Sequence, residues 1–265
     1  MIGQQKLQTL LRNLGFARLP QTILLVGKKG CGKHTLAKEL AKFYKVDLID
    51  LTDNIDLNTL MKVNDRLIRT FYTIDLDLID EKRQNVILKF LEEPTPTTYI
   101  ILFSSDTRFV IDTVLGRCTK YEFEKYTRDQ LKSFLQSDDE RPLDLCETPG
   151  QIMTFNKYTV DDLYKLCDNI VLNLSKASIG STFGIEDKIN FSDDYDKLDF
   201  DIFLNTLENR LLYYYELKQG DLEYIYEAMN LLAEVKNLTR DVRLDRKFLL
   251  KSYLLAIWEI SRGIK

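Results

Sequence analysis

The chain has 265 residues, of which 45% are hydrophobic and 29% are charged. These proportions are ordinary for soluble globular proteins, so they exclude wholesale disorder. The length indicates two or three domains. No run approaches the roughly 18 apolar residues of a membrane helix, and the first residues match no secretory signal, so we expect a cytoplasmic protein without a membrane partner. The formal net charge of −4 argues against an autonomous, tightly DNA-binding domain, because such domains need a basic surface.

The cysteines are scattered along the chain and form no C-x-x-C pair, as expected for reduced structural thiols. They are Cys31, Cys118, Cys146 and Cys167. This spacing predicts neither a zinc site nor a disulfide framework.

The first half of the chain alternates between short apolar runs and segments with helical periodicity. Predicted strands cover 22–26, 46–51, 71–76 and 99–103, and predicted helices cover 35–43, 57–69 and 81–91. Such alternation is typical of βαβ crossovers, so we predict a mainly parallel sheet.

The strand signals fade after about residue 126, and the rest of the chain reads as helices. Long helical patterns cover 203–218, 221–237 and 246–260. The segment 178–201 is rich in Gly, Ser and Asp, so it is the best candidate for a linker.

A glycine-rich loop directly follows the first predicted strand and precedes a helix. It reads GKKGCGKH and consists of Gly27, Lys28, Lys29, Gly30, Cys31, Gly32, Lys33 and His34. This matches the phosphate-binding pattern G-x-x-x-x-G-K-[ST] at every position but the last. The backbone N–H groups of such a loop surround a phosphate, and the lysine reaches the outer phosphates, so the sequence predicts a site for ATP or ADP.

Two positions depart from a hydrolytic P-loop site. The hydroxyl that binds Mg²⁺ is replaced by His34, with Thr35 one position late, and an imidazole is a poor ligand for this hard cation. Asp75 supplies the expected acidic residue after a second apolar strand, followed by Leu76 and Asp77. Asp77 would point away from the site if the strand continued, because side chains alternate across a sheet.

Several further motifs resemble the bacterial DNA polymerase III clamp-loader AAA+ family, and among its members the delta-prime subunits most of all. They are IGQQKL at 2–7, NVILKFLEEP at 85–94, YIILFSSD at 99–106 and LGRC at 115–118. The resemblance implies an α/β P-loop AAA+ domain with a parallel sheet over 1–126. A small helical lid over 127–177 and an all-α collar over 178–265, for oligomerisation, would follow.

The resemblance also implies roles for individual residues. Lys33 and its loop would hold phosphate, Ser104 or Ser105 would be the sensor-1 polar group, and Arg117 would be an arginine finger acting on a neighbouring subunit. Active members carry Glu where this chain has Leu76, and an arginine in the lid motif that here reads ETPGQIM at 147–153. We therefore expect the chain's own ATPase activity to be weak or absent.

The function implied is that of a stator-like clamp-loader subunit. Its partners would be the other subunits of the hetero-oligomer, the sliding clamp, and primer-template DNA within the complex. Three alternatives stay open: an active AAA+ motor subunit, a P-loop small-molecule kinase, and a non-enzymatic DNA-binding adaptor.

Overall fold

The computed structural model describes residues 2–56, 63, 67–155, 159–173, 189–190, 198–239 and 244–263. Contacts divide the chain into two compact units, Met1–Gln130 and Leu131–Lys265. This division lies close to the predicted end of the nucleotide-binding domain at residue 126. The separate lid and collar within the second half stay a prediction.

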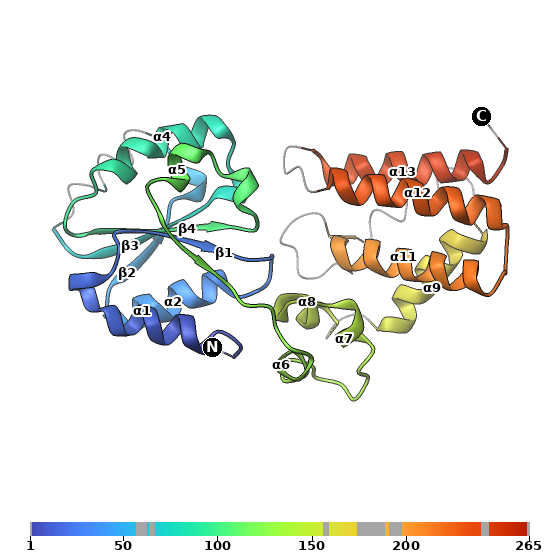
Figure 1. Cartoon of the computed structure of the whole chain (residues 1–265), viewed down its shortest axis with the longest axis horizontal. Helices are drawn as coiled ribbons and strands as arrows, with labels where there is room; N and C mark the ends of the chain where they lie inside the picture. The colour runs from blue at the N-terminus through green and yellow to red at the C-terminus, as the bar shows by residue number, and fades with distance from the viewer. Residues whose placement is uncertain are drawn as a thin grey trace. The chain divides into compact units, whose positions relative to one another are not determined.

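The first unit is built on a five-stranded parallel sheet with the order β2-β3-β4-β1-β5 (Figure 1). The strands are β1 (Thr22–Val26), β2 (Asp47–Asp50), β3 (Thr70–Asp75), β4 (Thr98–Ser104) and β5 (Thr119–Glu122). Four of them confirm the predicted strands. The edge strand β5 was not predicted, because its sequence TKYE carries no apolar run.

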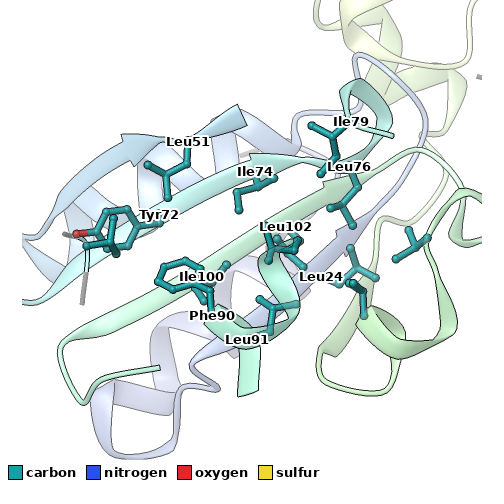
Figure 2. Packing of buried hydrophobic residues seen from close by; sticks show 14 residues of the cluster. Leu24, Leu51, Tyr72, Ile74, Leu76, Ile79, Phe90, Leu91, Ile100 and Leu102 are labelled. Atoms are coloured by element: carbon teal, nitrogen blue, oxygen red, sulfur yellow. The ribbon is translucent and has the colours of Figure 1, made fainter. Parts of the chain in front are cut away.

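The central strands bury alternating side chains on the two faces of the sheet, as the period of two in a strand requires. One face contributes Leu24, Tyr72, Ile74, Ile100 and Leu102 to the core that Figure 2 shows. The intervening residues Ile23, Leu25, Phe71, Ile101 and Phe103 belong to a second core on the opposite face. A sheet buried on both faces explains why β1 and β4 read as continuous apolar runs.

Helices cover both faces of this sheet (Figure 1). α1 (Gln5–Arg18) and α2 (Lys33–Tyr44) pack on one face, and α4 (Glu81–Glu92) and α5 (Asp112–Leu115) pack on the other. α1 was not predicted, although Leu7, Leu11 and Leu14 have helical spacing and pack against the second core. The predicted helix over 57–69 lies largely outside the described residues.

The second unit is mainly helical. Its longer helices are α9 (Val160–Asn173), α11 (Phe200–Glu216), α12 (Leu222–Leu238) and α13 (Arg246–Ile260), and the shorter ones are α6 (Arg128–Lys132, which begins in the first unit), α7 (Pro142–Leu145) and α8 (Pro149–Thr154). α11 packs between α9 and α12, and α12 packs against α13. Aspartates at 199, 221 and 245 cap α11, α12 and α13 by accepting hydrogen bonds from backbone N–H groups of the first turns.

The predicted linker over 178–201 falls mostly outside the described residues. Its described part is ordered, with a short parallel pair formed by β6 (Ile189–Asn190) and β7 (Leu198–Asp199), followed at once by α11. Within the described part of the chain, no helix is both long and apolar enough to span a bilayer.

Candidate functional site

The glycine-rich loop connects the carboxyl end of β1 to the first turn of α2. Gly30 and Gly32 have φ angles of 78° and 102°, which favour glycine and let the chain turn back into the helix. Gly32 is the residue that precedes α2, and Lys33 begins the helix. The predicted strand, loop and helix are thus confirmed, and the helix presents its positive amino-terminal end to the loop.

Gly27, the first residue of the loop, is closely packed. Its N–H donates to the carbonyl of Ser104 at the end of β4, at 3.0 Å. A Cβ atom at this position would lie 2.8 Å from the sulfur of Cys31 and 2.9 Å from Cβ of Phe123. The loop is also tied to the end of the sheet through Tyr126, whose hydroxyl donates to the Cys31 carbonyl at 2.6 Å.

Lys33 is turned inward. Its side chain is buried, and Nζ donates to the carbonyl of Gly27 at 2.5 Å. The ammonium group of the lysine therefore lies against the first residue of its own loop.

His34 faces the end of β3. Its Nε2 lies 3.5 Å from Oδ2 of Asp75, and its ring packs on Phe103 with the ring centroids 4.2 Å apart. The same side chain lines a pocket of about 230 Å³ together with Lys38 and Asp50 among others. The structure thus brings the residue at the Mg²⁺ position of the motif next to the predicted acidic residue, while Thr35 is exposed.

Asp77 is also part of this site, because β3 does not continue beyond Asp75. The chain enters a 3₁₀ turn, η2 (Leu76–Leu78), which buries Leu76 and returns Asp77 to the end of β4. Oδ1 of Asp77 accepts from the hydroxyl of Ser104 at 2.9 Å, and Oδ2 accepts from the backbone N–H of Ser105 at 2.7 Å. The alternation argument that pointed Asp77 elsewhere therefore does not apply.

The environment of Asp77 changes its acidity. Burial raises the pKa of this carboxyl above its ordinary value of 3.8, and the charge of Asp75 raises it further. Hydrogen bonds from Ser105 and Ser104 and the charge of Lys33 oppose this shift. Asp77 is therefore electrostatically coupled to both Asp75 and Lys33, while Ser104, a predicted sensor-1 residue, is fully buried and holds the Asp77 carboxylate.

Arg117 lies in a different part of the first unit. It follows α5, and its Nη2 donates to Oε1 of Glu92 at 2.5 Å while Nη1 donates to the carbonyl of Thr113 at 2.7 Å. The arginine side chain is 36% exposed. Two contacts thus orient the guanidinium and leave part of it open to solvent.

The sheet register separates Arg117 from the glycine-rich loop. In the parallel pair of β1 and β5, Ile23 aligns with Thr119, so Arg117 precedes the amino ends of the strands. The loop begins at Gly27, beyond the carboxyl end of β1. The four residue-to-residue steps from Ile23 to Gly27 alone span roughly 13 Å at about 3.3 Å per step. This is more than an arginine side chain can reach, so Arg117 and the loop belong to opposite ends of the sheet.

Two of the residues described above were not singled out from the sequence. Asp77 was set aside because the strand was assumed to continue, and only the 3₁₀ turn places it at the site. Glu92 lies within the LEEP segment that was used for the family resemblance, but its contact with Arg117 joins residues 25 positions apart, and nothing in the local pattern indicates it.

The comparisons with known proteins agree with the motifs. Residues 68–127, which include Asp77, Glu92 and Arg117 but not the glycine-rich loop, match the family model described as DNA polymerase III, delta subunit. A solved structure of a DNA polymerase III gamma subunit-related protein from Thermotoga maritima is 16% identical with a TM-score of 0.52, and the similarity covers 98% of this chain and 100% of that chain.

Two other similarities are weaker. A RuvB variant from Thermotoga maritima is 17% identical with a TM-score of 0.48, covering 96% of this chain and 88% of that chain. A shikimate kinase from Francisella philomiragia is 25% identical over 189 residues, which are 64% of this chain and 97% of that protein.

The fold is a five-stranded parallel α/β sheet with a glycine-rich P-loop after its first strand, followed by a helical region, and it is similar to the fold of the DNA polymerase III gamma subunit-related protein. The match over residues 68–127 further identifies the chain as similar to the clamp-loader subunits of DNA polymerase III, and confirms the resemblance predicted from LKFLEEP and GRC.

Proposed function

We propose that the chain is a stator-like subunit of a clamp loader, which supplies Arg117 to the nucleotide site of a neighbouring subunit and hydrolyses ATP poorly or not at all. The observation that carries this proposal is the position of Arg117 at the end of the sheet opposite to the chain's own P-loop. An arginine there cannot serve the nucleotide of its own chain, but it can serve one that another chain presents.

The contacts of Arg117 support this role. A planar guanidinium recognises phosphate best when its orientation is fixed, because less side-chain entropy is then lost on binding. Glu92 and the Thr113 carbonyl engage one nitrogen each and leave the remaining N–H groups available. Gly116 precedes Arg117 where relatives carry a serine. Its φ is negative, and a Cβ there would lie 3.4 Å from the Asp112 carbonyl oxygen, so the backbone at this position is one that a serine could also adopt.

The chain's own site supports poor hydrolysis. Leu76 stands where active relatives carry a glutamate that polarises water, and it is buried in the core. His34 stands where a hydroxyl would hold Mg²⁺. We propose that this loop binds ATP or ADP as a structural ligand and that the sister subunits perform the hydrolysis.

The partners in this proposal are the other subunits of a hetero-oligomeric clamp loader, the sliding clamp, and primer-template DNA held by the assembly. The family match to DNA polymerase III, delta subunit, supports this assignment. A delta-prime role is the finer form of the proposal, and it rests on a retained Arg117 together with the altered hydrolytic positions.

Reconstitution with the candidate ATPase partner and clamp tests the proposal. We expect Arg117→Ala to remove most of the clamp-stimulated ATP turnover and Lys33→Ala to remove little. Arg108→Ala is the matched control, because Arg108 is an exposed arginine in the same unit that pairs only locally with Asp106. Full turnover with Arg117→Ala would contradict the trans role, and a large loss with Lys33→Ala would favour the alternative of an active motor subunit.

The 25% identity to a shikimate kinase makes a P-loop small-molecule kinase the second candidate. A small-molecule kinase assignment does not account for the match over residues 68–127. Phosphate transfer from ATP to shikimate by the isolated chain would favour it.

A further inference from the structure

The acidic groups beside the P-loop are already occupied. Oδ1 of Asp75 accepts from the backbone N–H of Asp77 at 3.0 Å, and Oδ2 faces His34. Both carboxylate oxygens of Asp77 accept from Ser104 and Ser105. Each of the four oxygens therefore has a partner within the protein.

These residues do not fit the Mg²⁺ site of a hydrolytic P-loop. Mg²⁺ requires octahedral oxygen ligands and several waters, and an imidazole nitrogen at the central position offers neither. Across the described residues, no group of three or more acidic, histidine or cysteine side chains is placed to hold a metal ion. The side chain of His34 lies beside Asp75 and Phe103, at the position where a hydrolytic P-loop carries the hydroxyl that binds the metal.

We propose that this loop binds a nucleoside diphosphate or triphosphate without Mg²⁺, with the imidazole of His34 in the place of the metal. His34 is held between Phe103 and Asp75, so its ring is oriented before the ligand arrives. While Nε2 of His34 faces Asp75, an imidazolium ring can donate a hydrogen bond from Nδ1 to a phosphate oxygen, because both ring nitrogens of the charged form are donors. This contact does not require the dehydration that Mg²⁺ requires.

Positive charge that the metal would supply is present in the loop itself. Lys28 and Lys29 are exposed loop residues, and Lys33 is buried at its end. Together with the amino-terminal end of α2, these side chains neutralise a polyphosphate from one side. The inference rests on the nucleotide binding proposed above for this loop, and it does not depend on the trans role of Arg117.

Calorimetric titration of the full-length chain with ADP tests the inference, once in excess EDTA and once in excess MgCl₂. We expect the two dissociation constants to differ by less than about threefold. His34→Ser restores the hydroxyl of the motif, and for this variant we expect Mg²⁺ to tighten ADP binding by about tenfold or more. Lys38→Ser is the matched control, since Lys38 lines the same pocket one helical turn further along α2 and is not at the Mg²⁺ position of the motif.

Thermal unfolding of each variant establishes that it is folded. Wild-type binding that requires Mg²⁺, or no ADP binding in either buffer, would overturn the inference. Binding by His34→Ser that is as insensitive to Mg²⁺ as the wild type would also overturn it, because His34 would then not be the group that replaces the metal. None of these outcomes bears on Arg117, whose role is read from the partner's ATP turnover.

Discussion

Asp77 offers a sharp test of how the end of β3 is organised. Two substitutions separate its charge from its hydrogen bonds. Asp77→Asn keeps an acceptor for the N–H of Ser105 and removes the negative charge, whereas Asp77→Ala removes both. The hydroxyl of Ser104 retains a second acceptor in either variant, because it also donates to the Asp106 carbonyl at 2.9 Å.

The expected magnitudes follow from these contacts. Asp77→Ala leaves the partly buried N–H of Ser105 without its 2.7 Å acceptor, which costs about 1–3 kcal/mol of unfolding free energy. The corresponding loss in Tm is a few degrees per kcal/mol for a unit of this size. Asp77→Asn relieves the cost of a charge that burial and Asp75 both disfavour, so at neutral pH we expect it to be about as stable as the wild type or slightly more stable.

The pH dependence has a definite sign. Because the pKa of Asp77 is raised in the folded protein above the ordinary 3.8, the folded state binds more protons than the unfolded state between these two values. The stability that Asp77 contributes is therefore fully present below about pH 3.8 and is lost as the pH rises through the folded pKa. Asp77→Asn lacks this titration, so the wild type should lose stability relative to it as the pH rises through that window.

Urea unfolding followed by circular dichroism measures these differences. Hydrogen exchange of β3 and β4 assigns the transition to the first unit, since the single tryptophan, Trp258, belongs to α13 in the second unit. Equal destabilisation by Asp77→Asn and Asp77→Ala would refute the reasoning, because it would mean that the charge of Asp77 is favourable where it lies.

Substitutions at three further positions test other parts of the structure. Glu92→Ala should lower the partner's ATP turnover, and it should cause no further loss when combined with Arg117→Ala. Glu92→Gln should retain most of the turnover. If Glu92→Ala were as active as the wild type, the contact would not orient the arginine. Gly27→Ala places a methyl group 2.8 Å from the nearest sulfur, so we expect a loss of about 1–3 kcal/mol in urea unfolding, and unchanged stability would contradict the close packing of the loop. Arg210→Lys should destabilise the second unit by about 1.5–3 kcal/mol, read from Trp258 fluorescence. Lysine cannot reproduce the paired contacts of Arg210 with Asp168 at 2.6 and 3.0 Å.

The central strands and the long helices could be predicted because each carries a strong periodic signal. β4 and α13 are examples, and the predicted range of the latter, 246–260, agrees with the structure. β5 could not be predicted, because it is a polar edge strand that is stabilised by the rest of the sheet more than by its own sequence. α1 was missed although Leu7, Leu11 and Leu14 have the spacing of an apolar helix face and pack against the core.

The candidate site also contains residues that the sequence predicts and residues whose placement depends on the folded structure. The glycine-rich loop, Lys33 and His34 are contiguous and follow a known spacing, so the sequence predicts where they lie. The position of Asp77 depends on the 3₁₀ turn that follows the end of β3 at Asp75. This turn contains no glycine or proline, so the sequence does not indicate it. The pairing of Glu92 with Arg117 depends on tertiary contact between α4 and α5.

The central claim is that this chain contributes Arg117 to chemistry at another chain's nucleotide. Single-turnover hydrolysis of ATP by the assembled complex, with ATP binding measured separately, tests it most directly. We predict that Arg117→Ala lowers the hydrolysis rate by about 10³-fold or more at the site it serves and leaves ATP affinity nearly unchanged. A hydrolysis rate equal to that of the complex carrying Arg108→Ala would contradict the account.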